Sequence, residues 1–435
     1  MKYNPFAAIL SAVLLVFSAC APSSRLVYER SIAIPADYAG IVHAGRTGTQ
    51  EEFDYLHYLG ASWVLNSFYW DRIEPRQGEW NFSSYDTFVD SNRAEGIKVL
   101  GVLAYDVGWI HEDGRGHDYV PPDRVADFAR FVRNTVEHFR GRVDAWCIWN
   151  EPNTARFWKG TDDEFVELTR HVADAVREVD TEVVLLGGAF NRNVLGLPEK
   201  FIRKLFESGA MAKVDGIAFH PYELNPTRSA ALYDKFRRIV DDYGFGDKIW
   251  LTEAGYPTGG RYPTRIQENR FPEYVVKTFV LLAARGSDKL LWYQLFDPVE
   301  RSSGNSEDFF GLVRSDQDYT SKGAEAFRLC AQYLPGTNCV VQESGRDGIP
   351  GSVRMFWFYG ENGGALVFWN EGAGSRQVQV QLPGTDHTSH DSVSGSANQI
   401  QAEIVIKAEK IPVFITWQDV DTSSRRQAVS GDESR

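Results

Sequence analysis

Short apolar segments alternate with amphipathic segments along most of this chain, and this alternation constrains the fold more than any other feature. Strands are predicted over residues 39–44, 62–68, 97–105, 142–149, 182–188, 214–220, 248–252 and 290–295. Helices are predicted over residues 51–59, 83–95, 122–139, 162–179, 198–210, 227–243, 266–285 and 321–334. Strands that alternate with helices form a parallel sheet through right-handed crossovers, so the sequence predicts an α/β protein.

Eight strand–helix units fit a closed (β/α)8 TIM barrel, which typically takes about 250 residues, and we assign residues 39–334 to it. The spacing agrees with this count. Glu151 and Glu253 end the fourth and seventh predicted strands and lie 102 residues apart, or 34 residues per unit, which is close to the roughly 30 residues of a strand–helix–strand step. An open, doubly wound sheet is the alternative, and it is less favoured because no GxGxxG segment opens a first helix.

After Pro335 the pattern changes to alternating apolar and polar residues with glycine and asparagine between them. Strands are predicted at 340–341, 352–359, 365–369, 376–382, 402–406 and 413–417. This pattern is typical of antiparallel strands with one buried face, so residues 335–418 are predicted to form a small all-β, sandwich-like accessory domain. Residues 419–435 are polar and are predicted to be disordered.

The N-terminal segment has the composition of an export signal. Lys2 precedes an apolar run from Phe6 to Ala19, which is too short to span a bilayer but suits the central region of a signal peptide. No later stretch is long and apolar enough for a membrane span.

The segment Ser18-Ala19-Cys20 is similar to a bacterial lipoprotein cleavage site. Residues 1–20 are therefore predicted to be a lipoprotein signal peptide and residues 21–38 an N-terminal linker. Cys20 would carry the lipid and attach the protein to a membrane of the bacterial cell envelope. Phe17 departs from the leucine usual at its position, which leaves plain secretion open, and a buried N-terminal helix is a third interpretation.

The other cysteines fit an exported protein. Cys330 and Cys339 flank Pro335-Gly336 and would form a disulfide in an oxidising compartment; two separate thiols are the alternative. Cys147 lies inside an apolar strand and is predicted to be a buried, inert thiol. No His/Cys cluster has zinc-ligand spacing, and neither a metal nor another cofactor is expected.

Two glutamates end apolar strands, the position where α/β barrels carry their chemistry. Pro152 stops the strand that leads to Glu151, and Glu253 is followed by glycine and proline. Cleaving a glycosidic bond needs a proton donor for the leaving oxygen, together with a nucleophile or a base that activates water. We therefore predict Glu151 as the acid/base and Glu253 as the nucleophile of a glycosidase, although a lone strand-end glutamate is more often a structural ion-pair partner.

These motifs resemble the clan-A retaining glycoside hydrolases over about residues 39–330. In that clan an Asn–Glu pair ends the fourth strand, as Asn150-Glu151 does, and the nucleophile ends the seventh, as Glu253 does. The segment from Trp149 to Asn153, followed by Phe157-Trp158, looks most like glycoside hydrolase family 39, the β-xylosidase and exopolysaccharide-hydrolase family. Family 5 shares the same core.

The resemblance implies further substrate-binding residues. Asn150 would bond the sugar 2-hydroxyl, Tyr222 would contact the nucleophile, His220 would bond substrate or Glu253, and Trp292 would form the floor of the sugar site. His43, Tyr105 and Trp109 lie at or near other strand ends and are expected to line the cleft.

One departure concerns the second strand, where many clan members place an arginine near the nucleophile. This chain has Trp63-Val64-Leu65-Asn66-Ser67 there. Asn66 or Arg46 would take over that role, or the nucleophile is held in a different way.

The net charge is −13, from 46 basic and 59 acidic residues. Nucleic acid is therefore not an expected partner, because phosphate binding needs a basic face. The 12 tryptophans suit carbohydrate binding, since aromatic rings stack on apolar sugar faces, but they also suit a packed core.

The predicted reaction cleaves β-glycosidic bonds of an oligo- or polysaccharide with retention, by double displacement between carboxyl groups about 5 Å apart. A transglycosylase would use the same residues, and a lipid-anchored glycan-binding envelope protein would keep the barrel without turnover. The β-domain is interpreted as a support for the barrel, with glycan binding as the alternative. The sequence leaves open the sugar, the linkage, endo against exo cleavage and the oligomeric state.

Overall fold

A computed structural model of the chain describes residues 31–44, 46, 48–193, 196–261, 265–298, 304–314, 319–342, 344–345 and 349–419. The predicted signal peptide, Cys20 and residues 420–435 lie outside this range. Among the described helices, none combines the length and the apolar character that a bilayer crossing requires.

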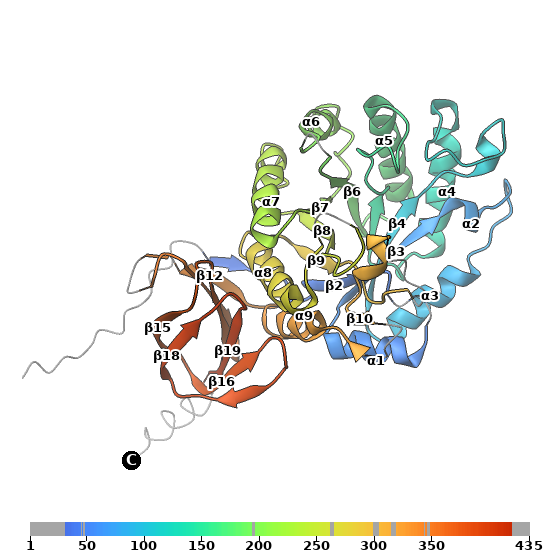
Figure 1. The fold of residues 1–435 in the computed structure, drawn as a ribbon. Coiled ribbons are helices and arrows are strands. Elements are labelled where there is room, and N and C mark those ends of the chain that lie inside the picture. The colour runs from blue at the N-terminus through green and yellow to red at the C-terminus, as the bar shows by residue number, and fades with distance from the viewer. Residues whose placement is uncertain are drawn as a thin grey trace, which may run out of the picture. The chain divides into compact units, whose positions relative to one another are not determined.

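The predicted barrel is confirmed. Eight parallel strands close in chain order, each paired with the next, and the last pairs with the first (Figure 1). They are β2 (Ala39–Val42), β3 (Trp63–Tyr69), β4 (Lys98–Ala104), β5 (Ala145–Ile148), β6 (Val184–Asn191), β7 (Gly216–His220), β8 (Ile249–Ala254) and β9 (Lys289–Trp292). Their carboxyl ends therefore meet at one mouth, to which both predicted catalytic glutamates belong.

Helices surround the strands on the outside of the barrel (Figure 1). They are α1 (Gln50–Leu59), α2 (Trp70–Ile73), α3 (Ser83–Ala94), α4 (Val125–His138), α5 (Asp162–Val179), α6 (Glu199–Glu207), α7 (Pro226–Asp241), α8 (Phe271–Ala283) and α9 (Lys322–Tyr333). Short 3₁₀ turns are η1 (Gly108–Ile110), η2 (Pro122–Arg124), η3 (Glu268–Arg270) and η4 (Ser306–Phe309). The helix predicted at 266–285 begins later than expected, because η3 precedes α8 and Pro272 occupies the first turn of α8.

Local sequence explains these elements, as α5 illustrates. Thr161 caps its first turn, and Glu164 completes a reciprocal capping box, an arrangement that stabilises a helix by about 1 kcal/mol. Its apolar residues, among them Phe165, Leu168 and Val172, recur at helical spacing and are buried against the barrel.

The segment from Trp70 to Phe82, part of the loop after β3, is tied down by the carboxylate of Glu74. This side chain is fully buried and accepts hydrogen bonds from Trp70 Nε1 at 2.8 Å, Gly78 N at 2.7 Å and Arg130 Nη1 at 2.8 Å. Three donors, one of them charged, compensate the burial of this carboxylate. The segment therefore fixes a wall of the mouth.

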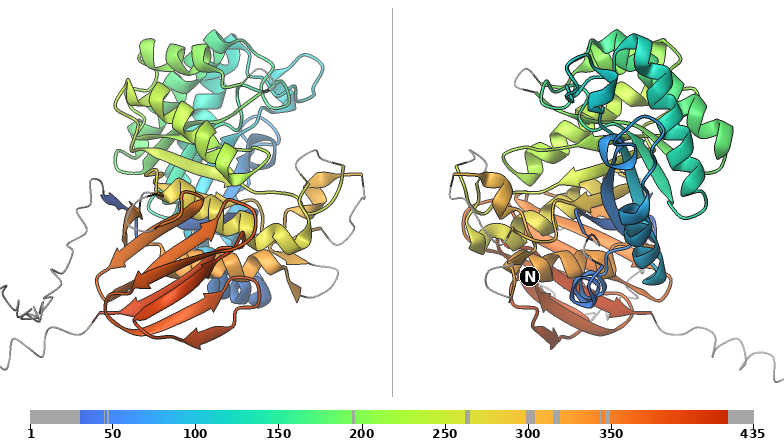
Figure 2. Two further views of the ribbon diagram at one scale, coloured as in Figure 1. Left: turned by 60° about the vertical axis from the view of Figure 1, so that its left-hand side comes forward. Right: turned by 90° about the vertical axis from the view of Figure 1, so that its right-hand side faces the viewer.

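The C-terminal region contains two antiparallel sheets. The larger one has the order β1-β12-β13-β14-β19-β16-β17, and its strands are visible in Figure 2. These strands are β1 (Ser31–Ala33), β12 (Asn338–Gln342), β13 (Val353–Gly360), β14 (Gly363–Asn370), β16 (Thr385–Asp391), β17 (Ala397–Gln399) and β19 (Val413–Gln418). The smaller sheet pairs β15 (Arg376–Gln381) with β18 (Glu403–Ala408). A two-stranded ribbon of β10 (Val313–Arg314) and β11 (Tyr319–Thr320) precedes α9.

An apolar core joins the two sheets, as expected of a sandwich-like domain. It includes Trp357 and Phe368 from the larger sheet and Val378 and Ile406 from the smaller one. The predicted strands do not include β16, because its segment Thr385–Asp391 is entirely polar and has no apolar alternation.

Part of the predicted linker 21–38 is instead a strand. Residues 31–33 form β1 and pair with β12, with Ile32 opposite Cys339. The chain thus contributes an edge strand to the C-terminal sheet before it enters the barrel, and a three-residue strand is too short to show alternation in the sequence.

The predicted disulfide is wrong in this structure. Cys330 and Cys339 are both free, buried thiols. Cys330 faces the barrel from α9, close to Tyr38, whereas Cys339 lies between β1 and β13. Burial raises the pKa of both thiols, so they behave as inert apolar groups, as does Cys147.

Candidate active site

The backbone around Glu151 takes a conformation that side chains larger than glycine rarely adopt. Trp149 has φ 63° and Glu151 has φ 42°, both in the left-handed region. The Trp149 indole is fully buried and donates to the Phe157 carbonyl at 2.8 Å, and Glu151 N donates to the Ala189 carbonyl of β6 at 2.9 Å. Packing and hydrogen bonds thus hold two strained residues, a feature that clusters at functional sites.

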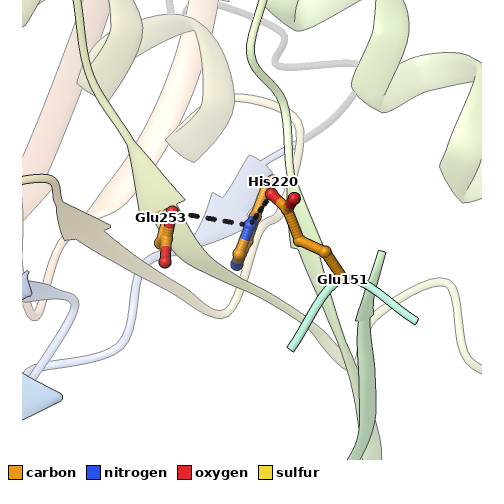
Figure 3. A group of neighbouring side chains, drawn as sticks. All are labelled: Glu151, His220 and Glu253. Carbon is orange, nitrogen blue, oxygen red and sulfur yellow. Dashed lines mark hydrogen bonds and ion pairs between the residues drawn. The ribbon is translucent and has the colours of Figure 1, made fainter. Parts of the chain in front are cut away.

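His220 connects the two predicted catalytic glutamates. Its Nδ1 lies 2.9 Å from Glu151 Oε1 and 3.6 Å from Glu253 Oε2, with the ring between the two carboxylates (Figure 3). Its Nε2 lies 3.0 Å from Thr252 Oγ1. When Glu151 is ionised it can only accept, so His220 Nδ1 then donates to it; a protonated Glu151 can instead donate to Nδ1.

The three side chains form a compact group. One atom from each of Glu151, His220 and Glu253 lies within 4.8 Å of the others. Among the described residues, this is the one group whose spacing would also suit a metal ion. Both ring nitrogens of His220 already have protein partners, so the arrangement fits proton transfer better than metal ligation.

Two further hydrogen bonds orient the carboxylates. The Tyr222 hydroxyl donates to Glu253 Oε2 at 2.9 Å, which agrees with the contact predicted for Tyr222. Asn191 Nδ2 donates to Glu151 Oε1 at 2.9 Å. Asn191 was not predicted, because the predicted strand 182–188 ended too early; the polar pair Asn191-Arg192 after the apolar Phe190 was the available signal.

The charges of the group are unbalanced. Burial raises the pKa of the Glu253 carboxyl and Glu151 adds to the rise, while His220 and the Tyr222 hydrogen bond oppose it; the net direction is upward. Burial pulls the pKa of His220 down, but Glu253 and Glu151 outweigh it and raise that pKa above its ordinary value. Shifted pKa values of neighbouring buried groups are common at functional sites.

The side of the cleft next to Glu151 is aromatic. Burial raises the pKa of Tyr105, and the nearby side chain of Asn150 opposes this rise. The Tyr105 ring lies 5.2 Å from that of Trp149 and, nearly parallel, 5.8 Å from that of Phe157. The structure thus brings Tyr105 and Asn150 close to Glu151 and Glu253.

The opposite side holds Tyr293, which sequence analysis missed. Its ring lies 5.4 Å from that of His43, and its hydroxyl donates to Glu307 Oε2 at 3.1 Å. Burial raises the pKa of Tyr293, Glu307 and Glu253 add to the rise, and Arg156 opposes it. Burial also lowers the pKa of His43 to about 4, assisted by Arg46, so this ring is neutral at pH 7.

Trp292, the predicted floor of the sugar site, is not brought to the glutamates. It is fully buried, and its ring packs near Tyr256, Phe271 and Phe279. Strand residues alternate in direction, so Trp292 points out toward α8 while the next residue, Tyr293, points into the mouth. Trp109 donates to the Glu74 carbonyl at 3.0 Å and packs on Trp70, in the wall of the mouth.

Neither candidate replacement for the missing arginine contacts the nucleophile. Among the described residues, the hydrogen bond and ion pair of the Glu253 carboxylate are with Tyr222 and His220, and neither involves Asn66 or Arg46. Arg46 acts on His43 instead. The nucleophile is therefore held by His220 and Tyr222 from the end of β7.

Comparison with known proteins finds similarity over part of the chain. Residues 32–236 match the model of the glycosyl hydrolases family 39. An endo-1,4-beta-xylanase B of Thermotoga neapolitana is 25% identical over 213 residues, covering 45% of this chain and 58% of its own length. The chain thus spans less than two thirds of the curated relatives it matches, with 40% and 39% of the length of two further xylanases.

Solved structures agree on the fold. A family 39 glycoside hydrolase from Bacteroides cellulosilyticus WH2 superposes with a TM-score of 0.70 at 19% identity, covering 88% of this chain and 81% of its own. A family 39 β-xylosidase from Caulobacter crescentus superposes with a TM-score of 0.61 at 15% identity, covering 90% and 98%. Both the barrel and the β-domain are therefore included in the likeness.

Proposed function

We propose, from the premise that this chain is a clan-A glycoside hydrolase most like family 39, that it hydrolyses β-glycosidic bonds of an oligo- or polysaccharide with retention of configuration. The observation that carries the proposal is the spacing of the two glutamates. Their facing oxygens lie within 4.8 Å, whereas an inverting pair keeps its carboxyl groups about 6.5 Å or more apart to admit a water molecule.

In the proposed first step, Glu253 attacks the anomeric carbon while Glu151 gives its proton to the leaving oxygen. In the second step, Glu151 takes a proton from water, which attacks the glycosyl–enzyme bond and releases Glu253. His220 and Tyr222 favour the ionised form of Glu253 against the effect of burial, and Asn191 and His220 orient the Glu151 carboxyl. Asn150, next to Glu151 in the chain and close to Tyr105, supplies a polar group beside the scissile bond.

Xylose-based β-glycosides are the proposed first substrates. The named relatives include an endo-1,4-beta-xylanase B and, over 110 residues at 29% identity, a beta-xylosidase of Caldicellulosiruptor saccharolyticus. The aromatic residues at the mouth, Tyr105, Phe157 and Tyr293, suit the apolar faces of a pyranose ring.

The test is release of nitrophenol from aryl β-xyloside, β-glucoside, β-galactoside and β-mannoside, followed by xylo-oligosaccharides. Glu151→Gln and Glu253→Gln should each abolish turnover, and Glu178→Gln, an exposed glutamate on α5, is the matched control. Proton NMR of the first product formed should show the β-anomer. An α-anomer as first product, or full activity of Glu253→Gln, would refute the proposal.

We also propose that Cys20 carries a lipid that attaches the protein to a membrane of the bacterial cell envelope, because Ser18-Ala19-Cys20 follows a signal-like apolar run. Expression of the full chain in a bacterium with labelled palmitate should give labelled protein in the membrane fraction, and Cys20→Ala should be unlabelled. Equal labelling of both would contradict this assignment.

A further inference from the structure

Strand β6 extends further toward the mouth than the neighbouring chain after β5 can follow by ordinary pairing. Glu151 N donates to the Ala189 carbonyl at 2.9 Å, but the next residue, Pro152, has no N–H to donate. β6 continues for two residues beyond Ala189 and ends at Asn191. The backbone N–H and C=O of Asn191 therefore need partners that the backbone after Glu151 does not supply in the usual way.

The side chain of Asn153 supplies both partners. Its Nδ2 donates to the Asn191 carbonyl at 2.7 Å, and its Oδ1 accepts from Asn191 N at 3.1 Å. A carboxamide presents a donor and an acceptor side by side, as a peptide group does, so it can replace a strand partner. Asn153 thereby fixes the backbone at the end of β6, from which the Asn191 side chain projects.

Asn191 in turn contacts the acid/base. It is aligned with His220 on the neighbouring strand β7, and Asn191 Nδ2 and His220 Nδ1 each lie 2.9 Å from Oε1 of Glu151. Among the described residues, the other carboxyl oxygen, Oε2, has no hydrogen-bond partner. Two contacts on one oxygen set the direction of the other, which is then available to the leaving oxygen of a substrate.

We infer that Asn153 is a positioning residue for the acid/base, because it holds Asn191 in register with His220 and so fixes the direction of the Glu151 carboxyl. This inference rests on the proposed function and adds a residue to it. Asn153 acts through Asn191, so its loss should slow those reactions whose leaving group needs a proton from Glu151. Reactions with a leaving group that departs without a proton should be unaffected.

The experiment compares two aryl β-glycosides of the sugar, or short oligosaccharide, that wild type cleaves. A dinitrophenyl group departs readily as an anion, whereas a phenyl group needs general acid catalysis. In Asn153→Ala, kcat/KM for the phenyl glycoside should fall about tenfold or more, as part of the 10²–10⁴-fold that a general acid contributes. The value for the dinitrophenyl glycoside should stay within about twofold of wild type. If Asn153→Ala does not fold, Asn153→Ser replaces it, with the same pattern expected.

A double-mutant cycle tests whether Asn153 acts through Asn191. Asn191→Ala should reproduce the selective loss on the phenyl glycoside, and adding Asn153→Ala to it should cause little further loss, because the two changes remove the same orientation of Glu151. Equal losses on both glycosides in Asn153→Ala, or a full additional loss in the double variant, would overturn the inference.

Asn370→Ala is the matched control. Asn370, at the end of β14, holds backbone groups in the same two-sided way, since its Nδ2 donates to the Gly374 carbonyl at 2.8 Å and its Oδ1 accepts from Gly372 N at 3.1 Å. It lies in the β-domain and is fully buried. This variant should lower the Tm but keep the wild-type ratio of the two kcat/KM values.

Hydrogen exchange separates this inference from the proposed function. If wild type cleaves neither aryl glycosides nor oligosaccharides, the proposed function fails. Exchange of the Asn191 backbone N–H, followed by NMR, then decides whether Asn153 holds the end of β6. Exchange should be faster in Asn153→Ala than in wild type and unchanged in Asn370→Ala. Equal exchange in wild type and Asn153→Ala would overturn the inference.

Discussion

Two buried charge clusters, both on barrel elements, differ in how their charges balance. The mouth cluster consists of Glu151, His220 and Glu253. The α8 cluster consists of Glu273 and Lys277, 3.0 Å apart, with Arg270 at 3.1 Å from Glu273. Lys277 also lies 5.4 Å from the Trp369 ring and 3.7 Å from Glu371, so this cluster faces the β-domain.

The two clusters shift their carboxylates in opposite directions. Burial raises the pKa of both, but Arg270 and Lys277 outweigh it and hold the pKa of Glu273 below its ordinary value. At the mouth, two carboxylates share one imidazole, and the pKa of Glu253 stays raised. In the α8 cluster the positive side chains compensate the buried carboxylate, which is typical of a structural ion pair. In the mouth cluster the carboxylates are not fully compensated, which is typical of a site of chemistry.

Removal of the proposed nucleophile should have the largest effect. Glu253→Gln keeps the size and the Tyr222 contact, and kcat/KM should fall on the order of 10⁴-fold or more. Thermal unfolding should occur at an equal or higher temperature than in wild type, since a buried, poorly compensated carboxylate becomes neutral. Calorimetry beside the aryl glycoside assay measures both effects. A variant that loses stability together with activity would contradict a purely chemical role.

The reciprocal change is made in the α8 cluster. Lys277→Ala leaves Glu273 buried with one cation fewer and should lower the free energy of unfolding by about 3–5 kcal/mol, the usual cost of breaking a buried ion pair. Activity per folded molecule should stay within about twofold of wild type. The surface control Lys204→Ala, whose partner Asp163 is exposed, should leave the free energy of unfolding close to that of wild type. Loss of activity without loss of stability would remove the distinction between the clusters.

The two clusters also differ in how well they could be predicted from the sequence. Strand-end carboxylates such as Glu151 and Glu253, and His220 next to a proline, could be predicted because chain order fixes which ends of parallel strands meet. The α8 cluster could not be predicted, since its partner Trp369 is supplied by the β-domain, far along the chain. Local patterns carry no information about such a long-range contact.

The direction of side chains was the second feature that could not be predicted from the sequence. Trp292 and Tyr293 are neighbours, and a one-residue difference decides which of them points into the mouth. The aromatic type alone favoured Trp292, whereas the structure turns Tyr293 toward His43. In the same way, free thiols at Cys330 and Cys339 depend on side-chain directions that spacing does not show.

A smaller change tests how the mouth cluster keeps Glu253 ionised. Tyr222→Phe removes the hydroxyl that donates to Glu253 at 2.9 Å, a contact that lowers the pKa of this carboxyl. The acidic limb of the kcat/KM profile should move to higher pH, and activity at neutral pH should fall about tenfold, the loss of one hydrogen bond to a charged group. Tyr256→Phe, a buried tyrosine that bonds Ser229 instead, should leave the limb unchanged. If the acidic limb of the kcat/KM profile does not shift in Tyr222→Phe, groups other than Tyr222 control the ionisation of Glu253.

The opposite pKa shifts also predict opposite dependences of stability on pH. Glu253, with a raised pKa in the folded state, binds its proton more tightly there than in the unfolded chain, so its contribution to stability falls as pH rises from 4.5 through the folded-state value. Glu273, with a lowered pKa, stabilises above pH 4.5 and loses that contribution as pH falls through its folded-state value. The free energy of unfolding should therefore be measured from pH 4 to 7. Relative to wild type, it should increase with pH for Glu253→Gln and decrease with pH for Glu273→Gln. If the stabilities of Glu253→Gln and Glu273→Gln depend on pH in the same way, the two clusters do not differ as stated here.

The smallest expected effect concerns the junction between the regions. Cys330 on α9 and Cys339 on β12 are free thiols within one apolar core that also contains Phe358 and Trp369. If packing and the α8 cluster hold the β-domain to the barrel, dithiothreitol should change the Tm by no more than about 1 °C, because there is no covalent loop to open. Thiol titration of the unfolded, non-reduced protein should count both cysteines as reactive. A Tm that falls by several degrees in reductant, with two thiols missing before reduction, would show that a disulfide closes this junction, and the role given to Lys277 would shrink accordingly.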